Sequence, residues 1–238
     1  MTTPPDPGTP HQNVTFPSNG GQAHGYLAVP PSGSGPGVVV IQEWWGLTDH
    51  IRDVTDRLAA EGFVALAPDL YGGHTTHNTD EAARMMQQLP VADAARDLAG
   101  AVDHLLSHEA VTSSKVGAVG FCMGGGFVLM LAATVGDRVG AAVPYYGIRG
   151  FTDEDAERVT APVLGHFAGD DGFATPEQAR HLQQILTDAG VDADIRIYEG
   201  AQHAFFNDTH DGGPYDPELA ERTWRETVTF LHTHLGDD

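Results

Sequence analysis

Short apolar runs rich in β-branched residues alternate with segments of helical periodicity along most of the chain. The run VVVI at residues 38–41 has the composition of a buried strand, and Ile51, Val54 and Leu58 follow it at helical spacing. Parallel strands need a crossover connection, which is usually a helix packed on one face of the sheet. The alternation therefore predicts an α/β fold with a mostly parallel central sheet and helices on both faces.

The other elements follow from the same two periodicities, with glycine and proline at their boundaries. Further strands are expected at 14–16 and 23–29, joined by a turn at Asn19-Gly20-Gly21, and at 63–67, 116–121, 141–146, 163–167 and 195–198. Helices are expected from Thr48 to about Glu61, where Gly62 would end the helix, and at about 80–88, 92–106, 123–135, 176–186 and 217–235. The first hairpin would add antiparallel strands at one edge of the sheet.

The length of 238 residues fits one domain, which we expect at residues 12–238. Residues 1–11 are proline-rich and lack the basic and apolar regions of a signal peptide, so we expect a disordered tail. No apolar run is long enough for a transmembrane helix. One cysteine cannot form an intramolecular disulfide, which fits a reducing compartment, and we expect a cytoplasmic protein.

The chain is strongly acidic, with a formal net charge of −21 from 33 Asp and Glu against 12 Lys and Arg. A surface of this kind disfavours binding to nucleic acids and to anionic membranes, because both need basic contacts. It either raises solubility or reflects adaptation to high salt. Neither membrane nor nucleic acid is therefore an expected partner, and the acidic surface is compatible with a monomer.

Cys122 is the only cysteine, and it occupies the middle of the sequence Gly-Phe-Cys-Met-Gly at residues 120–124. In the Gly-x-Ser-x-Gly motif the nucleophile lies on a sharp turn between a strand and a helix, where small neighbours are needed. The partial positive charge of the helix N-terminus would favour the thiolate, and the N–H of Met123 could hold an oxyanion. The alternative is a buried structural cysteine.

Two further residues complete the pattern of an activated nucleophile. An acid and then a histidine are expected after later strands, because a nucleophile needs a base and the base needs an orienting carboxylate. Asp171 follows the strand expected at 163–167, and His203 follows the strand expected at 195–198. Cys122, Asp171 and His203 thus have the expected order, although a second aspartate, Asp170, lies beside the first.

The sequence resembles the dienelactone hydrolase family over about residues 12–235. The matching segments are Gln42-Glu43-Trp44-Trp45-Gly46, Pro68-Asp69-Leu70-Tyr71, Gly120-Phe121-Cys122-Met123-Gly124-Gly125, Tyr145-Tyr146-Gly147, Gly169-Asp170-Asp171 and residues 198–205 (YEGAQHAF). The resemblance implies an α/β-hydrolase fold, a Cys-His-Asp triad, hydrolysis of an enol-lactone or ester, and no cofactor. It also implies that Asp171 is the triad acid and that Asp170 is an accessory carboxylate.

The resemblance assigns two more roles at the end of the strand at 38–41. It implies that Glu43 contacts the resting thiol and moves when substrate binds, which would keep the thiol protonated and protected from oxidation. The alternative for Glu43 is a polar residue at a strand end with no such role. The N–H of Trp44 would be the second donor to the oxyanion, beside that of Met123.

The substrate site departs from the family pattern. The resemblance implies two arginines that bind a substrate carboxylate, one shortly after the Pro-Asp-Leu-Tyr segment and one shortly after the histidine. Here those positions hold Gly72-Gly73-His74 and residues 204–208 (AFFND), without arginine. Histidine or asparagine does not replace a bidentate guanidinium. We therefore expect a less charged ester, lactone or other carbonyl compound, or an anionic group held by protonated His74 and His77.

Aromatic residues around the expected site could line an apolar pocket or serve only in packing. The residues expected to contact substrate are Trp45, Tyr71, His74, Tyr146 and Phe205. The pairs His74/His77 and His232/His234 lack the carboxylates that would complete a metal site, so no metal is expected. The alternatives to a dienelactone hydrolase-like enzyme are a general carboxylesterase or thioesterase, and a non-catalytic binding protein on the same fold.

Overall fold

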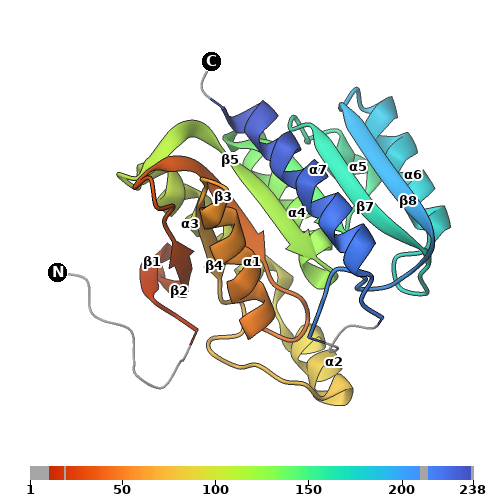
Figure 1. Cartoon of the computed structure of the whole chain (residues 1–238), viewed down its shortest axis with the longest axis horizontal. Helices are drawn as coiled ribbons and strands as arrows, with labels where there is room; N and C mark the ends of the chain where they lie inside the picture. Colours follow the sequence, from red (N-terminus) through yellow and green to blue (C-terminus); the bar gives the residue numbers. More distant parts are fainter. Residues whose placement is uncertain (1–10, 19, 210–213, 237–238) are drawn as a thin grey trace.

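An eight-stranded sheet runs through the residues described by the computed structural model, which are 11–18, 20–209 and 214–236 (Figure 1). Its order is β1 (Val14–Ser18), β2 (Gly21–Ala28), β4 (Val64–Pro68), β3 (Gly35–Ile41), β5 (Val111–Phe121), β6 (Val139–Tyr145), β7 (Val163–Asp170) and β8 (Ala193–Gln202). β2 pairs antiparallel with β1 and β4, and every later pair is parallel. The predicted sheet with an antiparallel hairpin at one edge is confirmed. Asn19 of the predicted turn and residues 1–10 of the predicted tail lie outside the described residues.

The helices also lie within a few residues of their predicted positions. They are α1 (Asp49–Ala60), α2 (Thr79–Gln88), α3 (Val91–Ser107), α4 (Met123–Val135), α6 (Pro176–Asp188) and α7 (Pro217–Leu235). The short helices α5 (Asp153–Ala156) and η1 (Gly136–Arg138) were not predicted, because a single turn is too short to show helical periodicity. None of the helices in the described part of the chain is long and apolar enough to cross a lipid bilayer.

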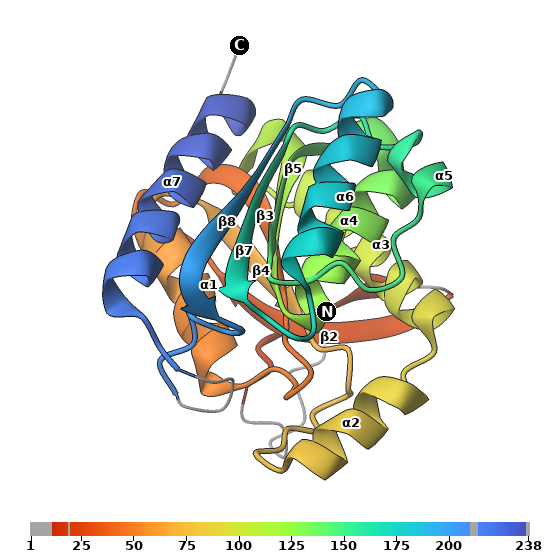
Figure 2. The same ribbon diagram turned by 90° about the vertical axis from the view of Figure 1, so that its right-hand side faces the viewer.

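The strands are apolar on both faces because helices cover both of them. Side chains of β3 alternate, so that Val39 and Ile41 join one buried cluster while Val38 and Val40 join the other. The first cluster includes residues of α3, α4 and α6, and the second includes residues of α1 and α7. Figure 2 shows α1 and α7 on one side of the strands and α3, α4 and α6 on the other.

The strand order changes direction between β3 and β5. After β3 the chain adds β4 on one side, and it then returns to place β5 on the other side of β3. In open α/β sheets the crevice beyond the carboxyl ends of two such strands is the usual ligand site. Glu43 and Trp44 follow β3 and Cys122 follows β5, so this topology brings three of the predicted site residues to one crevice.

Helix α2 differs from the other helices because it packs on neither face of the sheet. It lies beyond the end toward which the strands point (Figure 2), and Ala82 is its one fully buried residue. Asn78 caps its N-terminus, because the side chain of Asn78 accepts a hydrogen bond from the N–H of Glu81. Thr79 and Met86 of this helix line the same cavity as Cys122.

Candidate active site

Cys122 lies on a strained turn between β5 and α4. Its φ of 53° and ψ of −115° are rarely adopted by a residue with a side chain, and such backbone geometry is often found at functional sites. The turn is also tightly packed. A Cβ atom on Gly124 would lie 2.3 Å from the carbonyl oxygen of Ile41, and one on Gly147 would lie 1.8 Å from that of Cys122. These contacts explain why glycine is needed at position 124 of the motif and at position 147 in the loop after β6.

Two backbone N–H groups are directed at the sulfur of Cys122. They belong to Met123, the first residue of α4, and to Trp44 in the loop after β3, and both favour the thiolate. These are the two donors expected to hold an oxyanion. A substrate carbonyl attacked by this sulfur would develop its negative charge close to the same pair of amides, which makes them suited to stabilise it.

The thiol is nevertheless protonated in the resting site. Burial raises the pKa of the Cys122 thiol to about 12, and the nearby carboxylate of Glu43 is the next largest cause. The N–H at the helix N-terminus does favour the thiolate, as expected. Burial and the carboxylate of Glu43 raise the pKa by more than this N–H lowers it. A thiol is nucleophilic as the thiolate, so any reaction at this sulfur would require that a base take its proton.

His203 and Asp171 form the pair expected of a base and its orienting acid. The Nδ1 atom of His203 lies 2.7 Å from Oδ2 of Asp171, and the other carboxylate oxygen accepts the N–H groups of Phe173 and Ala174. Because the carboxylate accepts, Nδ1 carries the proton and Nε2 is left free to act as a base. Asp171 is buried and follows β7, while His203 follows β8.

Glu43 is held by a residue that the sequence did not single out. Its side chain is 1% exposed, and its Oε2 atom accepts a hydrogen bond of 2.6 Å from the Nδ2 of Asn207. Asn207 is equally buried, and its Oδ1 accepts the N–H and the hydroxyl of Thr209. Since a backbone N–H can only donate, Oδ1 must face Thr209 and the NH₂ group must face Glu43.

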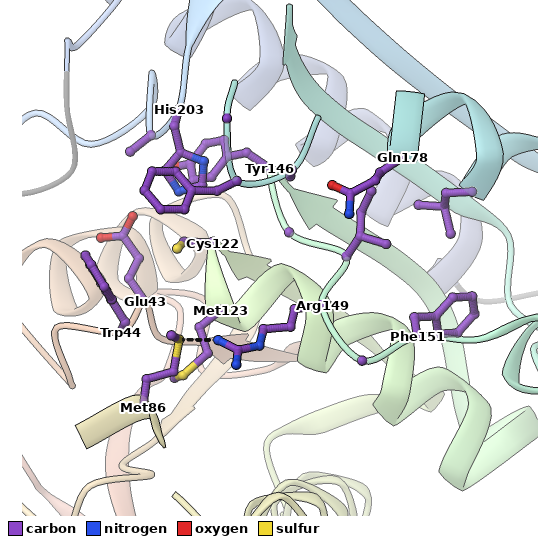
Figure 3. A pocket seen from close by; sticks show the side chains of 18 of the residues that line it. Glu43, Trp44, Met86, Cys122, Met123, Tyr146, Arg149, Phe151, Gln178 and His203 are labelled. Carbon is purple, nitrogen blue, oxygen red and sulfur yellow. Dashed lines mark hydrogen bonds between the residues drawn. The ribbon is translucent and has the colours of Figure 1, made fainter. Parts of the chain in front are cut away.

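Cys122 lines a cavity of about 660 Å³ that opens beyond the carboxyl ends of the strands. Glu43, Cys122 and His203 lie in one part of this cavity and Phe151 lies at the opposite side (Figure 3). The cavity wall around Phe151 is largely apolar. It is formed by Ile148 and Phe151 of the loop after β6 and by Leu182 and Ile185 of α6. A cavity of this size accommodates an ester considerably larger than an acetate.

The predicted substrate-binding residues divide into two groups. Trp45 and Tyr146 line the cavity, as do Trp44 and Met123. Tyr71, His74 and Phe205 are not among the lining residues. Tyr71 donates its hydroxyl to Sδ of Met123 at 3.4 Å, His74 is exposed on the loop before α2, and Phe205 is buried under Tyr146.

Other residues at the site were not predicted from the sequence. Besides Asn207 and the apolar wall of the cavity, they include Arg149, which follows β6 and lines the cavity, and Phe173, which lies two residues after Asp171. The ring of Phe173 is 74% exposed, and its centroid lies 5.0 Å from that of His203. The sequence shows an aromatic residue two positions after Asp171, but only the structure shows that this residue is exposed.

Among the described residues, no group of three or more His, Cys, Asp or Glu side chains is arranged to hold a metal ion. Nε2 of His232 instead donates a hydrogen bond of 3.1 Å to the carbonyl oxygen of Glu61, and the ring of His232 stacks on Phe63.

The strand order and the strand–turn–helix at Cys122 define an α/β-hydrolase fold. The family model for the dienelactone hydrolase family matches residues 23–235. The chain therefore belongs to the dienelactone hydrolase family and is a hydrolase of ester or lactone bonds.

Individual relatives agree with this assignment. "Protein usf" of Aquifex pyrophilus is 37% identical over 94% of this chain and 99% of its own length. A Bradyrhizobium protein named "Probable 2-oxo-3-(5-oxofuran-2-ylidene)propanoate lactonase" is 30% identical over 93% of this chain and 94% of its own length. Among solved structures, a dienelactone hydrolase-like promiscuous phosphotriesterase from metagenomic libraries superimposes with a TM-score of 0.80. It is 27% identical and covers 94% of this chain and 98% of its own.

Proposed function

We propose that this protein hydrolyses an enol-lactone or ester through a thioester on Cys122, with His203 as the base and Asp171 as the acid that orients it. The observation that carries the proposal is the convergence at one cavity of a strained cysteine, two N–H groups directed at its sulfur, and an oriented histidine. A cysteine that served only in packing would not need the strained turn or the two donors.

The reaction has two halves. In the first, Nε2 of His203 takes the proton of the thiol, the sulfur bonds to the substrate carbonyl carbon, and the N–H groups of Trp44 and Met123 hold the oxyanion. The carbon–oxygen bond of the ester then breaks, and the leaving oxygen takes the proton from His203. An enolate leaving group departs readily, which suits a thiol nucleophile.

In the second half, His203 takes a proton from water while the water oxygen bonds to the thioester carbon. The carbon–sulfur bond breaks, the carboxylic acid is released, and the proton returns to the sulfur. Glu43 takes part before these steps. Its carboxylate stabilises the protonated thiol of the resting site, and it either exchanges the proton with Cys122 or moves away when substrate binds.

A second candidate is a general carboxylesterase or thioesterase. The observation that favours it is the size of the cavity, about 660 Å³, together with the apolar side chains of Ile148, Phe151 and Leu182. A small lactone would fill only a fraction of that space. Comparing the rates for a dienelactone, a p-nitrophenyl ester and an acyl thioester separates the two candidates.

The decisive experiment compares the wild type with Cys122→Ala on p-nitrophenyl acetate and on a dienelactone, at low and at molar salt. We expect hydrolysis by the wild type and none above background by the variant. Cys122→Ser is the matched control for folding, because its side chain has a similar size. Equal rates for wild type and Cys122→Ala would show that the cysteine only packs, and no hydrolysis of any ester by the wild type would favour a binding protein.

A further inference from the structure

Arg149 differs from the other charged residues that line the cavity. Those residues are Glu43, His181 and His203, and each has a partner in the structure. Asn207 holds Glu43, Asp171 holds His203, and the ring of His181 lies 3.5 Å from the carboxylate of Asp153. Arg149 is the lining residue that carries a full positive charge at every physiological pH.

Within the described residues, Arg149 has no carboxylate within 4.0 Å, although acidic residues outnumber basic ones by 33 to 12 in this chain. Most of the other arginines have formed such pairs, as Arg96 has with Asp93 and Arg196 with Glu226. The guanidinium of Arg149 instead donates to the sulfur of Met86 at 3.5 Å. A thioether is a weak acceptor, so an anionic ligand could replace this contact at little cost.

The backbone of Arg149 is fixed relative to Cys122. It packs against the first turn of α4, where a Cβ atom on Gly126 would lie 2.8 Å from the carbonyl oxygen of Arg149 and 3.2 Å from its nitrogen. Gly126 follows Cys122 by four residues, which is about one helical turn. The backbone that carries the cation therefore has a fixed place relative to Cys122, and the exposed side chain lines the same cavity as Cys122.

Figure 3 shows Cys122 between His203 on one side and the guanidinium of Arg149 on the other. In the proposed reaction the leaving oxygen must lie near His203, because that residue gives it a proton. The acyl part of the substrate then points away from His203, toward Arg149. A negative charge on the acyl part would meet this cation.

We propose that Arg149 is a specificity-determining residue that binds a carboxylate on the acyl part of the substrate. This inference rests on the proposed function, and it narrows the substrate class to esters or lactones of dicarboxylic acids. Arg149 lies in the loop after β6. The family resemblance implies arginines elsewhere, after the Pro-Asp-Leu-Tyr segment and after His203. Arg149 also offsets the repulsion that a protein of net charge −21 exerts on an anionic substrate.

The test compares two esters of similar length, mono-p-nitrophenyl glutarate, which is anionic, and p-nitrophenyl hexanoate, which is neutral. The enzymes are the wild type, Arg149→Gln, Arg149→Lys and the control Arg84→Gln. Arg84 is an exposed arginine of α2 that donates to a backbone carbonyl and does not line the cavity. The quantity compared is the ratio of kcat/KM for the anionic ester to that for the neutral ester.

We expect Arg149→Gln to lower this ratio by about tenfold to a hundredfold, mainly through a higher KM, because a charge-assisted hydrogen bond is lost. Arg149→Lys should keep part of the preference, added salt should weaken it in the wild type, and Arg84→Gln should leave it unchanged. In the control Arg84→Gln the rate on each ester should stay within about twofold of the wild type.

An unchanged ratio in Arg149→Gln would overturn the inference, and so would an equal fall in Arg84→Gln. Neither result affects the proposed function, since hydrolysis of the neutral ester and its loss in Cys122→Ala test that separately. If the wild type hydrolyses neither ester, the proposed function fails and this inference fails with it.

Discussion

The amide of Asn207 donates a hydrogen bond of 2.6 Å to the carboxylate of Glu43, and both side chains are 1% exposed. This contact joins the loop after β8 to the loop after β3, next to the sulfur of Cys122. Asn207 is neutral, so it orients the carboxylate without neutralising it. The charge of Glu43 is, after burial, the next largest cause of the raised pKa of the Cys122 thiol.

Replacing Glu43 by Gln should make Cys122 more reactive. The variant keeps the hydrogen bond from Asn207, because the amide oxygen of Gln can accept it, but it removes the charge that raises the pKa of the thiol. The pKa should fall while staying above its ordinary value, since burial remains. We expect iodoacetamide to alkylate Cys122 severalfold faster near pH 8.

Glu177→Gln is the control for that measurement, because Glu177 is exposed on α6 and does not line the cavity. Cys122 is the one cysteine in the chain, so the mass increase reports on a single site. Unchanged alkylation kinetics in Glu43→Gln would show that the carboxylate does not hold the thiol protonated.

The adjacent aspartates Asp170 and Asp171 should respond very differently to the same substitution. Asp171→Asn places an NH₂ group against Nδ1 of His203, which forces the ring proton onto Nε2 and leaves no base for Cys122. By analogy with serine proteases, kcat should fall by about 10³- to 10⁴-fold. Asp170 is exposed at the end of β7, so Asp170→Asn should retain most of the activity.

Steady-state kinetics on p-nitrophenyl acetate, with circular dichroism to verify folding, would check this prediction. The opposite ranking of the two variants would exchange the roles assigned to the two aspartates.

The positions of Cys122, Asp171 and His203 could be predicted from the sequence because each follows a strand. Parallel strands end at one edge of the sheet, so residues that follow them come together whatever the details of packing. The same reasoning gave the order of helices and strands, which depends on periodicities within short segments. The same reasoning predicts that Glu43 and Trp44 lie at that edge, since they follow β3.

The residues that were missed or misplaced depend on contacts between distant loops. Asn207 and Arg149 are recognisable only through their neighbours Glu43 and Met86, which are 164 and 63 residues away. Tyr71 and His74 were expected at the cavity because they lie close in sequence to a family motif. Local spacing does not show toward which side a loop turns, and here other residues occupy the wall of the cavity.

Tyr145 and Tyr146 provide a test of the buried polar contacts. The hydroxyl of Tyr145 lies 2.7 Å from Oγ1 of Thr227, whereas that of Tyr146 has no hydrogen-bond partner among the described residues. Tyr145→Phe should lower the free energy of unfolding by about 1–2 kcal/mol, because a hydrogen bond is lost. Tyr146→Phe should leave it unchanged or raise it slightly, because an unsatisfied buried hydroxyl is removed.

Urea unfolding of both variants measures this difference directly. Equal losses of stability would mean that the hydroxyl of Tyr146 has a partner in the folded protein. A Tyr146→Phe variant that is stable but slow on p-nitrophenyl acetate would instead assign that hydroxyl to the reaction.

The buried residue His166 should make the fold sensitive to moderate acid. Burial is the largest cause that lowers its pKa to about 3, and the charges of Arg196 and Arg222 are the smaller ones, although the carboxylate of Glu226 lies 3.9 Å away. Its nitrogens lie 2.7 Å from the hydroxyl of Tyr198 and 3.3 Å from that of Thr227, so each nitrogen of the neutral ring has a hydrogen-bond partner. Protonation is much easier in the unfolded chain, where the pKa is about 6.5.

A histidine with a lowered folded-state pKa contributes stability that is fully present above pH 6.5 and is lost as the pH falls toward 3. Between pH 6.5 and 5 the loss from this one group is about 2 kcal/mol. His166→Gln cannot be protonated, so the difference in unfolding free energy between wild type and variant should shrink by about that amount from pH 7 to pH 5. His181→Gln is the control, since His181 is exposed on α6 and should leave the pH dependence as it is. A difference between wild type and His166→Gln that stays constant over this range would show that His166 is not the group whose protonation weakens the fold.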